Sequence, residues 1–338
     1  MSDSTEIARG VIRIPTGISN AYVLGSRQHW TLIDSGTEGY AGKIRDIAEQ
    51  HFGKGARPEA IVLTHGHFDH SGSAGALARE WQVPIYAHRL ELPYLTGKSK
   101  YPPPDPTVGG FMSQVIRFFP NKAYDYGDAV HELNVSNPQS LEGWRVIETP
   151  GHTPGHVSFF REEDGVLIAG DAFCTINQDN MIDAISKKPL VSRPPVYYTA
   201  NWEQAHESVR KLADLSPRLL AAGHGEPMGG VDALRQLREL ADHFPAPTHG
   251  RYVNHPPVMN ENGVVLLPAP VPDPVKRAAI GAIAAGTLAA IAVGFMRRKD
   301  EAPGEQEESG WRSELPRRVQ SEGVPSGDSL RWNWRKPA

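Results

Sequence analysis

The chain alternates short apolar runs of strand length with segments of helical periodicity. The apolar runs are rich in β-branched and aromatic residues and end at Gly or Pro, as buried strands do. They are NAYVLG, HWTLIDSG, AIVLTHG, PIYAH, WRVIETPG, VSFF, GVLIAGD and RLLAAGHG. Between several of them, apolar residues recur at helical spacing, within residues 40–53, 71–81 and 201–215. Strands that alternate with helices predict a layered α/β fold with mixed sheets.

Residues 93–140 interrupt this alternation with a stretch rich in Pro, Gly and aromatic residues. We expect an insertion between sheet elements. A long loop of this kind in a compact domain is often an active-site cover. We favour that interpretation over a surface excursion without a role.

The composition changes again after residue 245. Residues 245–275 contain eight prolines in 31 positions, which predicts an extended, semi-rigid linker over 246–275.

Residues 278–296 carry no charge and would form a helix about 28 Å long, close to the ~30 Å of a bilayer core. We therefore predict a transmembrane helix over 276–299, with an Ala-rich soluble helix as the alternative. Residues 300–338 mix both charges with Gly, Pro and Ser and predict a disordered, polyampholytic tail.

The charge and the cysteine content of the chain bear on its binding partners and on its cellular compartment. The chain has 35 Lys and Arg against 39 Asp and Glu, so its net charge gives no general attraction to nucleic acid or anionic lipid. The single cysteine, Cys174, cannot form an internal disulfide, which fits a reducing compartment. The first residues lack a basic region followed by an apolar core, so we expect no signal peptide. A cytoplasmic catalytic domain, anchored to the membrane by the C-terminal helix, follows as the expectation.

Histidines and aspartates gather where the apolar runs end. The segment IVLTHGHFDH places His65, His67, Asp69 and His70 directly after a strand. On a turn after a strand, side chains two positions apart can converge, and Gly66 lets the backbone fold tightly there. His65 and His67 can therefore bind one cation while Asp69 and His70 face a second. Imidazole and carboxylate groups are typical zinc ligands.

Three more candidate ligands follow later strands: His152 in ETPGHTPGH, Asp171 in LIAGDAF and His224 in LLAAGHGEP. A lone histidine is more often structural than ligating, but seven such groups, each at a strand end, favour a metal site. Nitrogen and oxygen donors without sulfur suit zinc first, and also manganese, iron or cobalt. We expect two divalent cations, Zn²⁺ before Mn²⁺, Fe²⁺ or Co²⁺.

Taken in order, these motifs resemble the metallo-β-lactamase-fold superfamily over about residues 8–245. THGHFDH is highly specific, and LIDSG, GHTPGH, AGD and GHG accompany it. The resemblance implies a four-layer αββα sandwich of two mixed sheets within a catalytic domain of residues 1–245. It also implies a division of the ligands: His65, His67 and His152 on the first metal, Asp69, His70 and His224 on the second, and Asp171 bridging both.

The ligand set also indicates which branch of the superfamily the chain resembles. The best-known β-lactamases of the superfamily use a cysteine where Asp171 stands and lack the histidine found here as His70, so antibiotic hydrolysis is disfavoured. Cys174 is then expected to be a small core residue. Diiron flavoproteins carry Glu at the position of His67, which disfavours that branch too. The pattern is closer to glyoxalase-II-like thioesterases and to lactonases, which share a bridging aspartate.

The resemblance implies a dinuclear-metal hydrolase that cleaves an ester, thioester or lactone of a small molecule by attack of a metal-bridging hydroxide. A cation pair can lower the pKa of a shared water to about 7. One alternative is a mononuclear-iron oxidoreductase of the persulfide-dioxygenase type. Another is a nuclease of the same fold, disfavoured because the catalytic region has no Lys/Arg run or aromatic-basic patch.

We assign supporting or catalytic roles to four further side chains and a second role to the ligand candidate Asp69. Asp69 is expected to orient the attacking water or to pass a proton to the leaving group. The resemblance places Asp34 of LIDSG in a hydrogen bond near the metals, and His156 either supports a ligand or caps its loop. Tyr197 and Tyr198 are candidates to place a phenol at the substrate carbonyl oxygen, as a tyrosine does in lactonases, with aromatic packing as the alternative.

Overall fold

The structure is a computed structural model that describes residues 4–119, 122–186, 188–273, 275, 276 and 278. The first half of the chain builds a seven-stranded sheet in sequence order. Its strands are β1 (Thr5–Ala8), β2 (Val11–Pro15), β3 (Asn20–Gly25), β4 (Trp30–Ile33), β5 (Ala60–Val62), β6 (Ile85–Ala87) and β7 (Val130–Glu132). Strands β1 to β4 pair antiparallel, and β4 to β7 pair parallel. The sheet is therefore mixed, as the sequence predicts.

The second sheet has five strands in the order β14-β13-β10-β9-β8. Their bounds are β8 (Arg145–Glu148), β9 (Val157–Arg161), β10 (Val166–Gly170), β13 (Leu219–Ala222) and β14 (Met228–Gly229). Strands β10 and β13 pair parallel, and the other neighbours pair antiparallel. Because β8 and β10 both run opposite to β9, the carboxyl ends of β8, β10 and β13 lie at one edge of this sheet.

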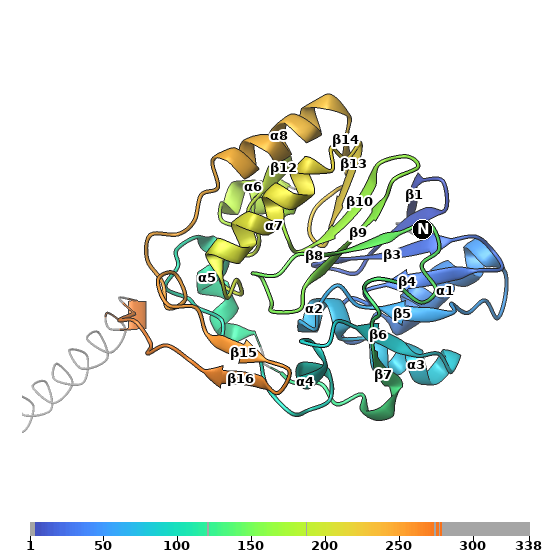
Figure 1. Cartoon of the computed structure of the whole chain (residues 1–338), viewed down its shortest axis with the longest axis horizontal. Helices are drawn as coiled ribbons and strands as arrows, with labels where there is room; N and C mark the ends of the chain where they lie inside the picture. Colours follow the sequence, from blue (N-terminus) through green and yellow to red (C-terminus); the bar gives the residue numbers. More distant parts are fainter. Residues whose placement is uncertain (1–3, 120–121, 187, 274, 277, 279–338) are drawn as a thin grey trace, which may run out of the picture. The chain divides into compact units, whose positions relative to one another are not determined.

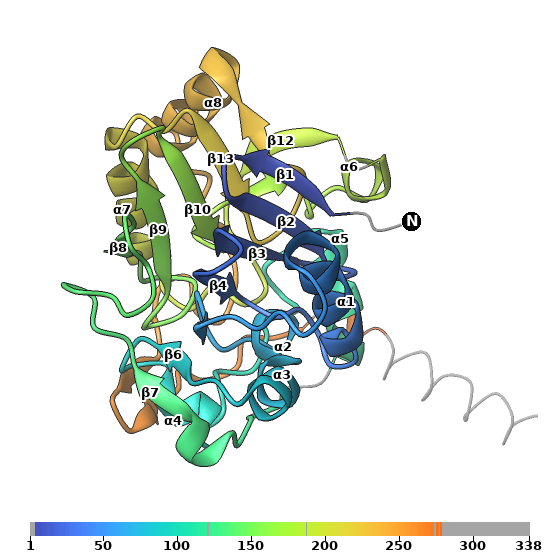
Figure 2. The same cartoon turned by 90° about the vertical axis from the view of Figure 1, so that its right-hand side faces the viewer.

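Helices cover the outer faces of both sheets (Figures 1 and 2). Helices α1 (Ala41–Phe52) and α3 (Ala74–Trp81) pack Ile44, Ile47 and Leu77 into one apolar cluster with the first sheet. Helices α7 (Trp202–Asp214) and α8 (Gly230–Asp242) do the same on the second sheet. A third cluster, which includes Tyr22 and Phe159, joins the facing sides of the two sheets. The predicted four-layer αββα sandwich is confirmed.

The remaining elements are short. They are α2 (Phe68–Ser71), α4 (Leu92–Leu95), α5 (Phe111–Val115), α6 (Met181–Ser186), the 3-10 turns η1 (Ile116–Phe118) and η2 (Gly127–Ala129), and the paired strands β11 (Cys174–Ile176) with β12 (Pro189–Ser192) and β15 (Val258–Asn260) with β16 (Gly263–Leu266). The helical segments predicted at 40–53, 71–81 and 201–215 correspond to α1, α3 and α7. Cys174 is a buried residue of β11, as expected of a small core side chain.

The insertion, residues 93–140, contributes β7 to the first sheet as well as α5 and the two 3-10 turns. Residues 246–273 pack against it. The hydroxyl of Tyr252 donates to the carbonyl oxygen of Pro103 at 2.7 Å, and Arg117 forms an ion pair with Asp273. Strands β15 and β16 thus lie within the range for which the Pro content predicts a linker.

Each helix in the described part of the chain is too short or too polar to span a lipid bilayer. Apart from residues 276 and 278, the transmembrane segment predicted at 276–299 and the tail predicted at 300–338 lie outside the described part of the chain.

Candidate metal centre

The loop after β5 carries four of the predicted ligands on a tight turn into α2. His67 is the residue before the helix, with an extended backbone, and Asp69 and His70 lie in the single turn that follows. The hydroxyl of Ser71 donates to the carbonyl oxygens of Gly66 and His67, both at 3.0 Å, which fixes the turn. A Cβ at Gly66 would stand 2.6 Å from the phenol oxygen of Tyr101, so a larger residue there would displace that phenol.

All seven predicted ligands converge on one point between the sheets. Three groups have donor atoms that lie within 4.8 Å of one another, and every member is buried: His65, His67 and His152; Asp69, His70 and His224; and His65, His70 and Asp171. The first two groups coincide with the two ligand sets that the sequence predicts. They come together because His152, Asp171 and His224 follow β8, β10 and β13, whose carboxyl ends share an edge.

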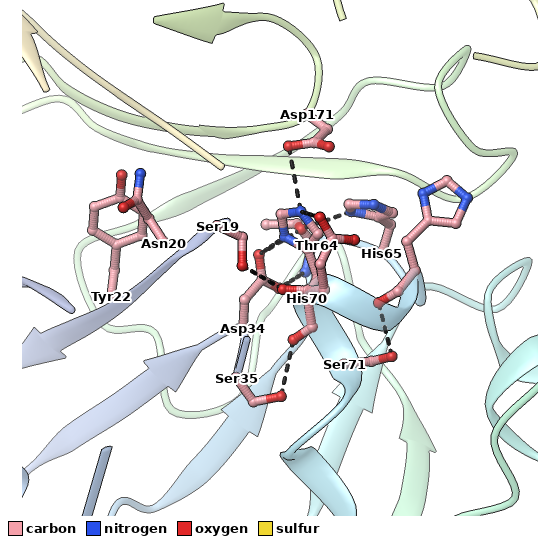
Figure 3. A network of polar contacts seen from close by, with 12 residues as sticks. Ser19, Asn20, Tyr22, Asp34, Ser35, Thr64, His65, His70, Ser71 and Asp171 are labelled. Carbon is pink, nitrogen blue, oxygen red and sulfur yellow. Dashed lines mark hydrogen bonds and ion pairs between the residues drawn. The ribbon is translucent and has the colours of Figure 1, made fainter. Parts of the chain in front are cut away.

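Asp171 contacts histidines of both sets. Its Oδ1 lies 3.5 Å from Nε2 of His70, and its Oδ2 lies 3.1 Å from Nε2 of His224 and 3.5 Å from Nε2 of His152. Figure 3 shows the carboxylate facing His70 across the centre of the site. This position between the two sets is the one that a bridging ligand requires.

The donor atoms fit divalent cations. Nε2 of His65, Nε2 of His70 and Oδ1 of Asp171 are buried and have no hydrogen-bond partner among the described residues. A buried polar atom without a partner costs about 1–3 kcal/mol, and here three such atoms face the same small volume. Nitrogen and carboxylate oxygen donors without sulfur are a common ligand set for zinc and its neighbours.

The electrostatics of the site keep several imidazoles neutral, which is the form that binds metals. Burial and the neighbouring histidines lower the pKa of His65 and His67 well below its usual value. Burial lowers the pKa of His152 to about 4. Burial also acts against protonation of His70, but the carboxylates of Asp171, Asp69 and Asp34 outweigh it and raise the pKa of His70 well above its usual value.

Four of the histidines use one ring nitrogen on the protein and direct the other toward the centre. Nδ1 of His65 lies 3.0 Å from the Thr64 hydroxyl, Nδ1 of His70 lies 2.8 Å from Asp34, Nδ1 of His152 lies 3.3 Å from the Thr199 hydroxyl, and Nδ1 of His224 lies 2.7 Å from the carbonyl oxygen of Ile18. Contacts of this kind fix the ring orientation of metal-binding histidines.

The two predicted supporting residues both contact ligand candidates. Asp34 pairs with His70 and is also shown in Figure 3. Nε2 of His156 accepts a hydrogen bond from the backbone N–H of Asp171 at 2.8 Å, and its Nδ1 lies 2.8 Å from the Thr149 hydroxyl. Burial lowers the pKa of His156 to about 3, so the acceptor nitrogen stays free of a proton.

Comparison with known proteins places the chain in a family. A family model described as the metallo-beta-lactamase superfamily matches residues 14–224. A probable metallo-hydrolase of Bacillus subtilis, YflN, is 43% identical over 242 residues, which cover 70% of this chain and 92% of that protein. The chain belongs to the metallo-beta-lactamase superfamily.

Two further similarities within the superfamily are more distant. The hydroxyacylglutathione hydrolase GloC of Haemophilus influenzae is 27% identical over 113 residues, which cover 33% of this chain and 49% of GloC. The crystal structure of the B3 metallo-beta-lactamase BLEG-1 is 25% identical with a TM-score of 0.48, covering 70% of this chain and 99% of that one.

The structure distinguishes the two adjacent tyrosines of this superfamily member. The hydroxyl of Tyr197 donates to the side-chain oxygen of Gln178 at 2.7 Å. The ring of Tyr198 lies 4.6 Å from that of His67, and its buried hydroxyl has no hydrogen-bond partner in the part of the chain that the structure describes. Of these two tyrosines, Tyr198 is therefore the one that lies next to a ligand candidate and has a hydroxyl without a partner among the described residues.

Two residues at the site escaped the sequence analysis. Tyr101, from the insertion, places its ring 4.5 Å from His67, and its hydroxyl donates to the buried carboxylate of Glu91. Neither residue belongs to a recognisable motif. For Tyr101 the sequence offers one signal, the richness of residues 93–140 in aromatic residues, and Glu91 lies outside that range.

Proposed function

We propose that this member of the metallo-beta-lactamase superfamily is a dinuclear-metal hydrolase of ester, thioester or lactone bonds. The observation that carries the proposal is the convergence of seven buried His and Asp side chains into two ligand sets that share Asp171. Family membership supports a hydrolase. The name of YflN, a probable metallo-hydrolase, supports the same conclusion.

In this proposal His65, His67 and His152 hold the first cation, Asp69, His70 and His224 hold the second, and Asp171 contributes to both. Zn²⁺ suits these donors first, and Mn²⁺, Fe²⁺ or Co²⁺ also fit. Bound cations would supply a Lewis acid for the substrate carbonyl and would bring the pKa of a water near 7.

Asp69 is the residue that we assign to proton handling. Its side chain is 9% exposed, and its Oδ2 lies 3.5 Å from Nε2 of His224. A carboxylate next to the attacking water can orient that water and accept its proton, then deliver the proton to the leaving alkoxide or thiolate. The carbonyl oxygen of Asp69 accepts a hydrogen bond from the Ser19 hydroxyl, which holds the helical turn in place.

Tyr198 is the residue that we assign to the substrate carbonyl. A phenol that donates to the oxygen on which negative charge develops stabilises the transition state more than the ground state. Its hydroxyl is available for such a bond because nothing in the described protein accepts from it. Tyr197, whose hydroxyl is bound to Gln178, is left with a packing role.

The similarity to GloC favours the thioester within this set of bonds, because GloC is named a hydroxyacylglutathione hydrolase. Esters and lactones require the same attack on a carbonyl carbon with a different leaving group. The two ligand sets would support hydrolysis of a thioester, an ester or a lactone equally well, so substrates with each of these bonds are tested.

The experiment is a hydrolysis screen of the purified protein over thioesters, lactones, phosphodiesters and β-lactams, with metal content measured on the same samples. We expect turnover of at least one acyl substrate that scales with about two divalent cations per chain. His224→Gln should remove the activity, whereas the matched control His29→Gln, at an exposed histidine that pairs with Glu59, should retain it. Metal-loaded protein that hydrolyses none of the acyl substrates would overturn the proposal.

A further inference from the structure

Glu91 is a buried carboxylate between the two loops that carry the first ligand set. It is 0% exposed and immediately precedes α4. Its Oε2 accepts the backbone N–H of Gly66 at 3.0 Å, and its Oε1 accepts the backbone N–H of Gly155 at 2.7 Å. Gly66 lies between His65 and His67, and Gly155 lies three residues after His152. One side chain thus joins the main chains of both ligand loops.

Tyr101 completes this connection. Its hydroxyl donates to Oε2 of Glu91 and accepts the backbone N–H of Gly66 at 2.9 Å. The ring also stacks on that of Tyr94, at a centroid distance of 3.9 Å and an angle of 16°. Because the same ring lies 4.5 Å from His67, the phenol also limits the orientation of that imidazole.

Glycines at positions 66 and 155 let the two loops pack closely, the first against Tyr101 and the second against Glu91. A Cβ at Gly155 would lie 2.9 Å from Cγ of Glu91 and 2.6 Å from Nδ1 of His88. The Cβ of a larger residue at position 66 would collide with the Tyr101 phenol in the same way. The side chains of Glu91 and Tyr101 thus fill the space between the two loops.

A carboxylate buried without partners would be strongly unfavourable. Burial does raise the pKa of Glu91, and the donors from Tyr101, Gly66 and Gly155 oppose that effect. Hydrogen bonds from N–H and O–H groups to a charged oxygen are roughly twice as strong as neutral ones. A buried acid with three such donors is a rigid connection between the parts that supply them.

We infer that Glu91 is a positioning residue that sets the separation of the His65–His67 loop from the His152 loop and thereby tunes cation binding by the first ligand set. The inference rests on the proposed function only for the assignment of these histidines as metal ligands. It does not depend on which bond is hydrolysed.

The test is Glu91→Gln, measured by competitive chelator titration and by the visible spectrum of Co²⁺-loaded protein. Glutamine conserves the volume but replaces one acceptor oxygen by an amide NH₂, which must face a backbone N–H. We expect affinity for one of the two cations to fall by about 10–100-fold, as for other groups that orient metal ligands. The Co²⁺ absorption bands should shift, because the ligand geometry changes.

Asp105→Asn is the matched control. Asp105 is also buried, at 3% exposure, and accepts the backbone N–H groups of Thr107 and Arg251, so it joins two segments that carry no ligand candidate. This variant should lower thermal stability while leaving the Co²⁺ spectrum and the cation affinity as in the wild type. An equal loss of cation affinity in both variants would reduce Glu91 to a general structural role and overturn the inference.

Tyr101→Phe provides a second route if Glu91→Gln does not fold. It deletes only the hydroxyl between Gly66 and Glu91, so we expect a smaller loss of cation affinity, roughly 3–10-fold, and a shifted Co²⁺ spectrum. If the variants that fold, Glu91→Gln or Tyr101→Phe, have the Co²⁺ spectrum and the cation affinity of the wild type, the inference is overturned. If the wild-type protein binds two cations but hydrolyses no acyl substrate, the proposed function fails and the inference on Glu91 stands. If the wild type binds none, both fail.

Discussion

The carboxylate of Asp34 lies 2.8 Å from Nδ1 of His70, while Nε2 of the same ring lies 3.5 Å from Asp171. Asp34 also accepts the backbone N–H and the hydroxyl of Thr64, both at 2.8 Å. One carboxylate thus fixes the ring of a ligand candidate and the backbone just before His65. Its own backbone has a φ of 58°, in the left-handed region, which Asn and Asp tolerate best among residues with a side chain.

Asp34→Asn should weaken cation binding by the set of Asp69, His70 and His224. Asparagine suits the left-handed backbone, so the change removes the negative charge with little strain. The amide still has one acceptor oxygen, but it cannot satisfy both Thr64 and a protonated Nδ1 of His70 as the carboxylate does. We expect a loss of about 10–100-fold in affinity for one cation, measured by chelator titration. The surface variant Asp46→Asn, which changes only a pair with Arg45, should bind as the wild type does.

Asp69→Asn should reduce turnover more than it reduces metal content. The amide oxygen can still face the cation, but an amide cannot accept a proton at neutral pH. Loss of general acid–base catalysis predicts a fall in kcat of about 100-fold or more. The measurement pairs steady-state kinetics with metal analysis of the same preparation. Turnover that stays near the wild-type value at full metal content would contradict the role given to this residue.

Tyr198→Phe and Tyr197→Phe delete the hydroxyls of adjacent residues, one without a partner among the described residues and one bound to Gln178. Loss of the uncommitted phenol of Tyr198 should lower kcat by roughly 100-fold if it stabilises the developing oxyanion, with little change in KM. Loss of the Tyr197 hydroxyl breaks its bond to Gln178 and should leave kcat within a few-fold of the wild type. Equal effects on kcat in the two variants would rule out the distinction between them.

The ligand candidates could be predicted from sequence because local rules are enough to place them. Each follows an apolar strand, and strands that run in the same direction bring the groups at their carboxyl ends to one edge. The pairing of β10 with β13 and of β4 with β5 supplies that geometry. The choice between Tyr197 and Tyr198 could not be made in this way, because neighbouring side chains differ only in direction, which depends on the tertiary packing.

Glu91 and Tyr101 were beyond prediction for a related reason. Their importance comes from the return of the chain after β6 to the loop that holds Gly66, and no pattern in residues 93–140 encodes that path. The eight prolines of residues 245–275 predict an extended linker, but part of this range forms β15 and β16. Proline restricts the backbone of any segment, whether it is extended in solvent or packed on a domain.

The packing of residues 246–273 gives a prediction about where the catalytic unit ends. Tyr252 is 3% exposed and bonds to Pro103, the buried Asp105 accepts the backbone N–H of Arg251, and Asp273 pairs with Arg117. A chain that stops at residue 245 would leave the Asp105 carboxylate without one donor and would expose the apolar surface that Tyr252 covers. Loss of a buried aromatic side chain alone costs about 3–5 kcal/mol.

The expected result is a melting temperature lower by roughly 6–20 °C for residues 1–245 than for residues 1–276, since 1 kcal/mol shifts Tm by about 2–4 °C in a chain of this size. The longer chain retains every contact named above and is the control for the loss of the C-terminal segment. Tyr252→Ala in residues 1–276 should reproduce much of the decrease. Equal melting temperatures for the two chain lengths would show that the catalytic domain ends near residue 245, as the composition alone predicts.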